Sequence, residues 1–343
     1  MSSDLTSVRN DGPITHMTRL GYQIPNFTYP GVGPARLFDA VAQQAREADS
    51  SGFDTVLVMD HFYQLPQIGD PDQYMLECYT LLAALARETS NVRLSSLVTG
   101  NTYRNPAVLA KTVTTLDIVS QGRATLGIGA GWFALEHDAF GIEFGTFTDR
   151  FEKLEEALQI VSPMLRGGKA TVDGTWYATL DAMNEPPPVS KVPIMIGGAG
   201  EKKTLRMVAQ YADESNLICD DAAIAHKLDV LAAHCAAVGR DRSEITVSKQ
   251  KNCCIAPTHD EARSDMLAYF ARRGLDVSKM SEDDLATRLG QVVWGDPDEV
   301  GEHFSSLLST HDGLDGFTIN MIPNGFIEGR VELLGQTLAP LFS

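Results

Sequence analysis

The stretch that decides the fold is Thr55-Val56-Leu57-Val58-Met59-Asp60-His61. Its first five residues are apolar or β-branched, which predicts a strand buried on both faces, as is typical of parallel sheets. A carboxylate and an imidazole follow at once, where that strand ends. The segment therefore predicts a buried parallel strand that carries a polar pair at its carboxyl end.

The same pattern recurs along the chain. Seven further strands are predicted, at Leu20–Pro25, Val92–Leu97, Ala124–Ile128, Pro193–Ile196, Glu214–Ile218, Ile245–Lys249 and Gly316–Asn320. Segments of helical period separate them, and Asn105-Pro106 and Asp296-Pro297 supply helix start signals. Eight strands that alternate with helices predict an α/β fold of the (β/α)8 TIM-barrel type. A doubly wound open sheet is the alternative, because the sequence does not show whether the eighth strand pairs with the first.

The 343 residues are expected to form one barrel domain over 19–343, preceded by a disordered leader over 1–18. Two segments exceed the barrel plan. The first, at about 167–192, is expected to form a β-ribbon and an extended arm. The second, at about 257–291, follows the seventh strand, and its charged helical pattern predicts an insertion that covers the barrel mouth.

Charge and composition exclude several classes of function. The chain has 28 basic and 45 acidic residues, a net charge of −17, which disfavours binding to nucleic acid or to an anionic membrane. No apolar run reaches the roughly 18–20 residues that span a bilayer. Five cysteines without CxxC spacing indicate reduced thiols, so a cytoplasmic location is expected.

Polar or glycine residues follow the predicted strands, where TIM barrels carry their active sites. They are Asn26, Asp60-His61, Ser96 to Thr99, Gly129 to Trp132, Gly197 to Lys202, Lys249 and Asn320. The pair Asp60-His61 is the strongest candidate, because an imidazole titrates near neutrality and a carboxylate can orient it or bind a ligand. The alternative is a turn-capping aspartate beside an ordinary loop histidine. No histidine has metal-ligand spacing, so no metal site is predicted.

The glycine-rich turn Gly197-Gly198-Ala199-Gly200 opens a helix after the fifth strand. Bare backbone amides, the helix start and the donors of Lys202 and Thr204 favour an anion or phosphate site. A tight strand-to-helix turn without a ligand is the alternative. The spacing of a Walker A loop is not present.

With these residues identified, the chain resembles the luciferase-like oxidoreductases, and within them the actinobacterial branch that uses the deazaflavin coenzyme F420. The similar stretches are Gly21 to Phe27, Val58 to Phe62, Thr102 to Ala107, Leu126 to Trp132 and Ile194 to Gly200. The resemblance implies a barrel with an insertion after strand seven. It also implies a small-molecule substrate, and a homodimer is expected.

The resemblance also implies a cofactor site. Asp60 and His61 would lie at the redox end of the ring, with Gly131 near it. Ser96, Leu97 and Thr99 would lie in a strand-three bulge behind it, with a non-proline cis peptide expected at Ser96-Leu97. The phosphate would be held by Gly197, Gly198, Ala199, Gly200, Lys202 and Thr204.

One residue departs from the pattern of the sugar-phosphate dehydrogenases in this superfamily. They carry a glutamate proton donor where this chain has Trp132, which puts sugar-phosphate oxidation in doubt. Asn26 and Trp132 are therefore assigned to the substrate pocket. Glu136, one helical turn further on, is the nearest replacement acid.

The function expected is hydride transfer between coenzyme F420 and an organic substrate, with His61 supplying or removing the proton and Glu136 as a second catalytic residue. An FMN-dependent luciferase-like monooxygenase is the nearest alternative. A barrel that binds cofactor without turnover is another. A Schiff-base aldolase would need a buried lysine at a strand end, for which only Lys249 and Lys251 are candidates.

Overall fold

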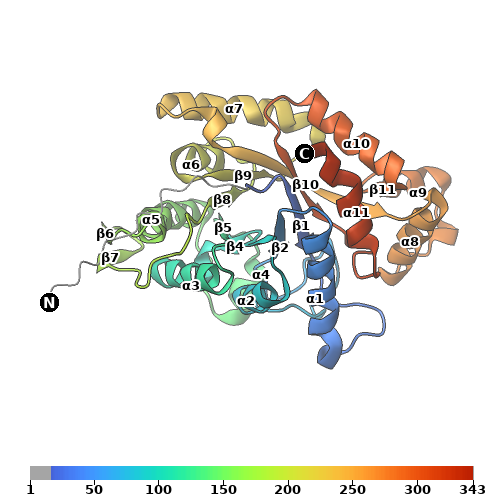
Figure 1. Ribbon diagram of the computed structural model, residues 1–343, viewed down its shortest axis with the longest axis horizontal. Helices are drawn as coiled ribbons and strands as arrows, with labels where there is room; N and C mark the ends of the chain where they lie inside the picture. Colours follow the sequence, from blue (N-terminus) through green and yellow to red (C-terminus); the bar gives the residue numbers. More distant parts are fainter. Residues whose placement is uncertain (1–16, 343) are drawn as a thin grey trace.

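The computed structural model describes residues 17–342, and its centre is a closed barrel of parallel strands (Figure 1). The eight barrel strands are β1 (Leu20–Ile24), β2 (Thr55–Val58), β3 (Arg93–Ser96), β5 (Ala124–Gly129), β8 (Ile194–Gly197), β9 (Glu214–Leu217), β10 (Thr246–Ile255) and β12 (Gly316–Asn320). The ring closes where β12 pairs with β1, with Leu20 beside Phe317. This closure confirms the predicted TIM barrel and excludes the open doubly wound sheet. The expected leader, 1–18, falls almost entirely outside the described residues.

Helices surround the barrel on its outer face, as Figure 1 shows. They are α1 (Pro34–Ser50), α2 (Cys78–Glu88), α3 (Pro106–Val119), α4 (Ala134–Phe140), α5 (Phe147–Leu165), α6 (Thr204–Tyr211), α7 (Ile224–Ala237), α10 (Pro297–Thr310) and α11 (Arg330–Leu338). The predicted start signals are confirmed. Asn105 accepts hydrogen bonds from the backbone N–H groups of Ala107 and Val108, and Asp296 forms a capping box with Glu299.

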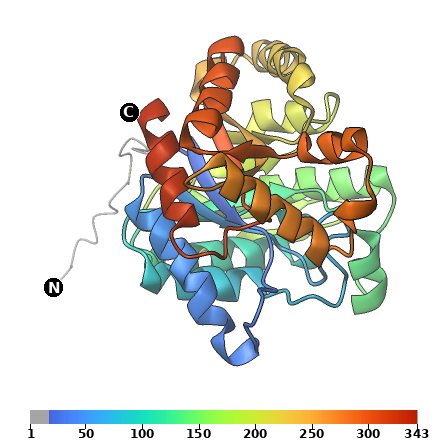
Figure 2. The same ribbon diagram turned by 90° about the vertical axis from the view of Figure 1, so that its right-hand side faces the viewer.

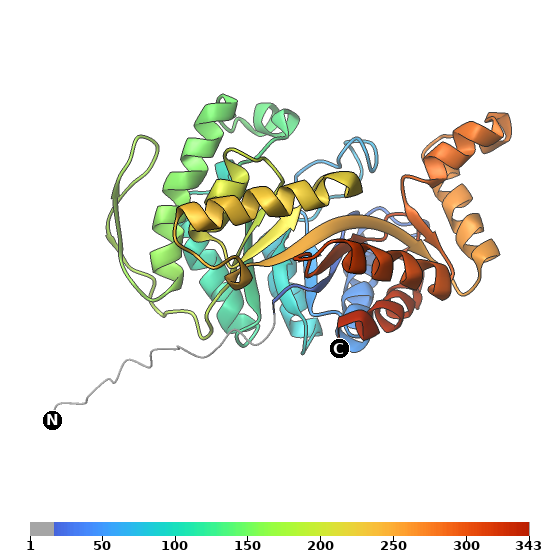
Figure 3. The same ribbon diagram turned by 90° about the horizontal axis from the view of Figure 1, so that it is seen from above.

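Two segments of the chain extend out of the barrel, at opposite ends of the molecule (Figure 3). The antiparallel hairpin of β6 (Ala170–Asp173) and β7 (Ala178–Ala182) lies beside α5. After β10, the chain forms α8 (His259–Arg272) and α9 (Glu282–Leu289), then returns through β11 (Val293–Gly295). Figure 2, viewed from that end, shows α8 and α9 in front of the barrel strands. The insertion predicted after strand seven is therefore confirmed.

A bulge after β3 shapes the barrel mouth. Its non-proline cis peptide joins Leu97 and Val98, one bond beyond the predicted Ser96-Leu97 position, so that prediction was wrong by one residue. The bulge turns back into the short strand β4 (Thr99–Gly100), which pairs with β5. Glycine is needed at two neighbouring positions, because a Cβ on Gly129 or Gly197 would lie 2.8 Å from a methyl group of Val98.

Two buried carboxyl groups lie at the opposite, amino end of the barrel. Burial raises the pKa of Glu214 to about 7, against hydrogen bonds from Thr18 and the charge of Arg93. Burial likewise raises the pKa of Asp54 to about 6, against hydrogen bonds from the backbone of Leu20 and Arg19. This end of the barrel therefore holds two carboxyl groups that resist ionisation.

Candidate active site

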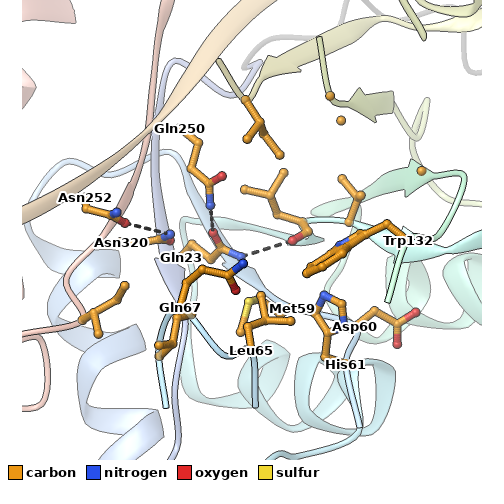
Figure 4. Close-up of a pocket in the computed structure, with 18 of the residues that line it drawn as sticks. Gln23, Met59, Asp60, His61, Leu65, Gln67, Trp132, Gln250, Asn252 and Asn320 are labelled. Carbon is orange, nitrogen blue, oxygen red and sulfur yellow. Dashed lines mark hydrogen bonds between the residues drawn. The ribbon is translucent and has the colours of Figure 1, made fainter. Parts of the chain in front are cut away.

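A cavity of about 950 Å³ opens at the carboxyl ends of the barrel strands. Its walls come from strand ends around the whole ring and from the α8–α9 insertion. Figure 4 shows Gln23 and Gln250 at its centre, with Asn252 and Asn320 on one side and His61 and Trp132 on the other. The cavity therefore lies where a TIM barrel carries its chemistry.

His61 reaches this cavity from the end of β2, and Glu136 of α4 holds it from behind. The Nδ1 atom of His61 lies 2.9 Å from a carboxylate oxygen of Glu136. The same carboxylate accepts hydrogen bonds from the Tyr103 hydroxyl and from the backbone N–H groups of Phe62 and Tyr63. Glu136 is fully buried, so its carboxylate bonds only His61, the two residues that follow His61, and Tyr103.

The negative charge of Glu136 decides which ring nitrogen of His61 carries the hydrogen. Burial raises the pKa of the Glu136 carboxyl, but hydrogen bonds from His61 and Tyr103 outweigh burial and set the pKa below its usual value. An ionised carboxylate only accepts hydrogen bonds, so Nδ1 of His61 must carry the proton. The Nε2 atom has no hydrogen-bond partner within residues 17–342 and is left to exchange a proton with a ligand.

Asp60 does not orient His61, as had been one of its two expected roles. Its carboxylate receives both guanidinium nitrogens of Arg104, at 2.6 and 3.0 Å, and the N–H of Gly100 at 3.1 Å. Burial raises the pKa of Asp60, and the paired Arg104 opposes that rise. The Nη2 atom of Arg104, which donates to Asp60, also donates to Glu77 at 2.6 Å. Asp60 thus joins the end of β2 to β4 and to Arg104, and it also lines the cavity.

Two aromatic side chains stand beside the histidine. Trp132 stacks on Phe133 with ring centroids 5.2 Å apart, and both rings meet His61 edge-on at 5.9 and 5.8 Å. Trp132 is 54% exposed and lines the cavity, so a ligand would cover it. Trp132, with Phe133 packed behind it, gives the cavity an apolar wall at the point where a proton would be exchanged.

The glycine-rich turn lines the cavity next to this wall. Gly198 has φ +115°, which favours glycine, and a Cβ on Gly200 would lie 2.9 Å from the Thr204 hydroxyl. Two cations lie near it: Arg150 lines the cavity, and Lys203 lies 5.5 Å from the ring centres of Phe147 and Phe151. Two cations therefore lie near the turn in a protein with a net charge of −17.

The structure brings most of the predicted site residues together. The residues that line the cavity are Asp60, His61, Leu97, Thr99, Gly131, Trp132, Gly197, Gly198, Ala199, Gly200 and Thr204. Four do not line it. Glu136 lies behind His61. Ser96 is buried, and its hydroxyl forms hydrogen bonds with the Thr99 hydroxyl and the carbonyl of Gly127. Lys202 is exposed outside the cavity, and the Asn26 carbonyl accepts a hydrogen bond from Tyr29.

Several lining residues were missed from the sequence. Gln23 lies in the predicted strand Leu20–Pro25, whereas Gln250 directly follows the predicted strand Ile245–Lys249 and lies in β10, which is longer than predicted. Both line the cavity, and their polarity was the available signal. Tyr269, Phe270 and Arg273 come from α8 and the residue after it, and no pattern in the insertion marked them. They lie at the mouth only because the insertion folds back over it.

The Schiff-base alternative finds no support. Lys249 and Lys251 lie 3.3 and 2.7 Å from Asp221, and neither lines the cavity, which removes the candidates for a Schiff base. Across residues 17–342, no group of three or more His, Cys, Asp or Glu side chains is placed to hold a metal ion. None of the helices in that range has the length and apolarity to cross a membrane.

Comparison with known proteins places this fold in a family. The family described as luciferase-like monooxygenase matches residues 18–310. An F420-dependent glucose-6-phosphate dehydrogenase of Microbacterium testaceum is 30% identical over 249 residues, 71% of this chain and 70% of that protein. Its counterpart in Kineococcus radiotolerans is 32% identical over 183 residues, 53% of this chain and about half (51%) of that protein.

A solved structure extends the likeness over nearly the whole chain. The coenzyme F420 dependent tetrahydromethanopterin reductase of Methanopyrus kandleri superposes with a TM-score of 0.73 at 20% identity, covering 96% of this chain and 100% of that one. At this identity the superposition supports the fold alone. The family match covers most of the sequence and agrees with that fold, so the chain belongs to the luciferase-like monooxygenase family.

Proposed function

We propose that the protein is an oxidoreductase that transfers hydride between coenzyme F420 and a small organic substrate. The observation that carries the proposal is how the two ring nitrogens of His61 are paired. Glu136 holds one ring nitrogen, and the other lacks a partner within residues 17–342 on a residue that lines the cavity. A positioned proton carrier beside a ligand-sized cavity suits hydride transfer, which leaves one proton to be supplied or removed. The names of the relatives agree with this cofactor.

The residues present fit a flat ring with an anionic chain. Gly129 and Gly131 line one wall with bare backbone, next to the Val98 side chain of the bulge. The buried Thr204 hydroxyl, Arg150 and Lys203 supply donors and positive charge for a phosphate. A planar group and its phosphate would therefore each find matching chemistry along one side of the cavity.

When bound, F420 would supply or accept the hydride at its C5 carbon. The protein's part is to position the substrate, exclude water and handle the proton. During substrate oxidation, Nε2 of His61 would take the proton of the substrate's hydroxyl or N–H group, and the anionic Glu136 would stabilise the imidazolium. During reduction, the same nitrogen would return the proton. Trp132 and Phe133 would keep water from the reacting atoms.

Parallel titration with F420 and FMN tests the proposal against its nearest alternative, an FMN-dependent monooxygenase. Binding is followed through quenching of tryptophan fluorescence, with Trp132→Phe as the control that assigns the signal to this cavity. We expect F420 to bind at least tenfold more tightly than FMN. Tighter binding of FMN, together with substrate-dependent oxygen consumption by the reduced complex, would support the monooxygenase instead.

A further inference from the structure

One arc of the cavity is lined by amide side chains. The lining residues contributed by β1, β10 and β12 are Gln23, Gln250, Asn252 and Asn320, which we call the amide wall. None of the four is charged, although the chain as a whole carries a charge of −17. This arc therefore offers hydrogen bonds to a ligand without a net charge.

A directed chain of hydrogen bonds runs through the wall. The Gln23 amide nitrogen donates to the carbonyl of Leu97 at 3.1 Å, and the Gln250 amide nitrogen donates to the Gln23 amide oxygen at 2.9 Å (Figure 4). A backbone carbonyl can only accept, so Gln23 must turn its NH₂ group toward Leu97. Gln250 must then turn its own NH₂ group toward Gln23. The Leu97 carbonyl thereby fixes the orientation of both amides.

The end of this chain is an unpaired acceptor. The Oε1 atom of Gln250 has no hydrogen-bond partner within residues 17–342, and the half-buried side chain lines the cavity. Because its orientation is fixed, Gln250 cannot rotate its amide to present NH₂ there without breaking the bond to Gln23. A ligand that fills this part of the cavity must therefore offer Gln250 a donor or leave an acceptor unpaired.

Part of the wall lies across the barrel from the surface proposed for the cofactor. In the ring order of the barrel, β5 and β8 carry the glycine-lined surface and lie across the ring from β12 and β1, whereas β10, which carries Gln250, lies across from β3. His61 follows β2, between the two arcs. A substrate held between the arcs would contact the amide wall on the side away from the ring, with His61 next to it.

We propose that the amide wall selects neutral substrates that carry an N–H donor beside a carbonyl, such as a lactam or a carboxamide, and that Gln250 accepts that N–H. This proposal rests on the proposed function for its assignment of the opposite arc to the cofactor. Gln23 is a positioning residue, since it sets the direction of the Gln250 amide. A carboxylate in this position would leave the Gln250 oxygen without a donor, because it brings only acceptors to that atom.

The test uses a phenyl-substituted δ-lactam, its N-methyl derivative and the corresponding δ-lactone. The phenyl group suits the apolar side chains of Leu65, Ile68 and Ile322, which also line the cavity. Dissociation constants are measured by ligand-observed NMR on the purified protein, with and without F420. We expect the lactam to bind at least tenfold more tightly than the other two. Equal binding of all three would overturn the proposal, and because the cofactor-free protein is also measured, that result is distinct from a failure to bind F420.

The variant Gln250→Met keeps the length of the side chain and removes the acceptor. It should weaken lactam binding at least tenfold, leave the N-methyl lactam and the lactone unchanged, and change the F420 dissociation constant less than twofold. Gln336→Met, which alters an exposed glutamine of α11 that does not line this cavity, should change none of these values. An equal loss of F420 affinity in Gln250→Met would assign the wall to the cofactor and overturn the proposal. If Gln250→Met does not fold, the lactam comparison on the unaltered protein decides alone.

Discussion

At the scale of single residues, His61 and Glu136 have different roles in the site. His61 alone meets the cavity, and Glu136 is committed to holding it and the loop that follows it. Both were expected to be catalytic, but the structure makes Glu136 a positioning residue. The two roles should differ in measured kinetics.

We expect His61→Ala to lower kcat at least tenfold, because a positioned acid–base group is typically worth about 10²–10⁴-fold in rate. The dissociation constant of F420 should change less than kcat does. Glu136→Gln should also lower kcat, but by less than His61→Ala, since one amide oxygen can still accept hydrogen bonds from the loop. Steady-state turnover and fluorescence titration of each variant check this.

His137 provides the control for these variants. It is the neighbour of Glu136, it is fully buried, and its ring nitrogens lie 2.7 Å from the Thr102 hydroxyl and 2.9 Å from the Phe133 carbonyl. His137→Gln should lower Tm while leaving kcat close to that of the parent. Normal turnover by His61→Ala would pass the proton-transfer role to water and contradict the assignment.

The sequence predicted His61 because a strand end is a local feature. It could not predict the partner of that residue, since Glu136 lies 75 positions away and meets it only after β2 and α4 are both placed. The same holds for Gln23 and Gln250, which are separated by 227 positions and joined by barrel closure. Residue types at strand ends are readable from sequence, whereas contacts across the ring are not.

At the scale of elements, the bulge after β3 is held between two glycines of neighbouring strands. Gly129 of β5 and Gly197 of β8 both face the methyl groups of Val98. A third glycine, Gly127 of β5, faces the carbonyl of Ser96, so this glycine also serves packing against the segment that leads into the bulge.

Gly129→Ala should destabilise the protein by about 1–3 kcal/mol, because the added methyl group overpacks the contact with Val98. The double variant Gly129→Ala/Val98→Ala should recover most of that loss. Gly301→Ala is the control, since its Cβ would have an ordinary 3.6 Å neighbour on a helix and should leave Tm equal or higher. Denaturant unfolding measures all four proteins, and a lack of recovery in the double variant would contradict the packing argument.

The insertion is fastened to the loop after β2 by one side chain. Arg273 donates hydrogen bonds to the carbonyl groups of Gln67 and Pro66, at 2.7 and 3.0 Å. The loop also carries Leu65 and Ile68, which line the cavity. The α8–α9 insertion and the loop are thus joined across the cavity mouth.

Arg273→Ala should therefore speed amide hydrogen exchange in α8 and α9 and raise KM more than it lowers kcat. Arg273→Lys should restore only part of the protection, because one ammonium group lacks the fork geometry that reaches two carbonyls. Exchange mass spectrometry and steady-state kinetics check the two effects. Unchanged exchange in Arg273→Ala would show that other contacts hold the insertion in place.

At the scale of the whole molecule, the pH dependence of stability should reflect the amino end of the barrel. The pKa of Glu214, about 7 in the folded state, lies above its ordinary 4.5. The folded protein therefore holds the proton more tightly than the unfolded chain does. Its contribution to stability is fully present below about pH 4.5 and is lost as the pH rises through about 7, an effect of at most about 3 kcal/mol.

Glu214→Gln removes this titration and keeps the shape of the side chain. The variant should be more stable than the parent at pH 8, and the difference should shrink toward zero near pH 5. Urea unfolding at a series of pH values measures it, and the difference between the two proteins cancels the other titrating groups. A variant that is less stable at pH 8 would show that the Glu214 charge is favourable through Arg93.

The fold as a whole was readable from the sequence, since all eight barrel strands and the insertion after the seventh appear where they were predicted. Strands such as β2 and β8 are short and mostly apolar, which is a local signal, and the more polar β9 and β10 were found from their place between helical segments. The position of the cis peptide was missed by one bond, because neighbouring residues of a bulge differ little in pattern. The homodimer stays a prediction that sedimentation velocity would check.

The length of β10 has a consequence for protein engineering. Its residues Ser248–Asn252 pair with β12 in the barrel, and Cys253–Ile255 continue the same strand and pair with β11 beyond it. The insertion is consequently rooted in a barrel strand and is not carried on a loop. A chimera that exchanges the insertion for that of another family member should therefore place its joints at Thr258 and Gln291, so that the shared ladder and its register are inherited intact.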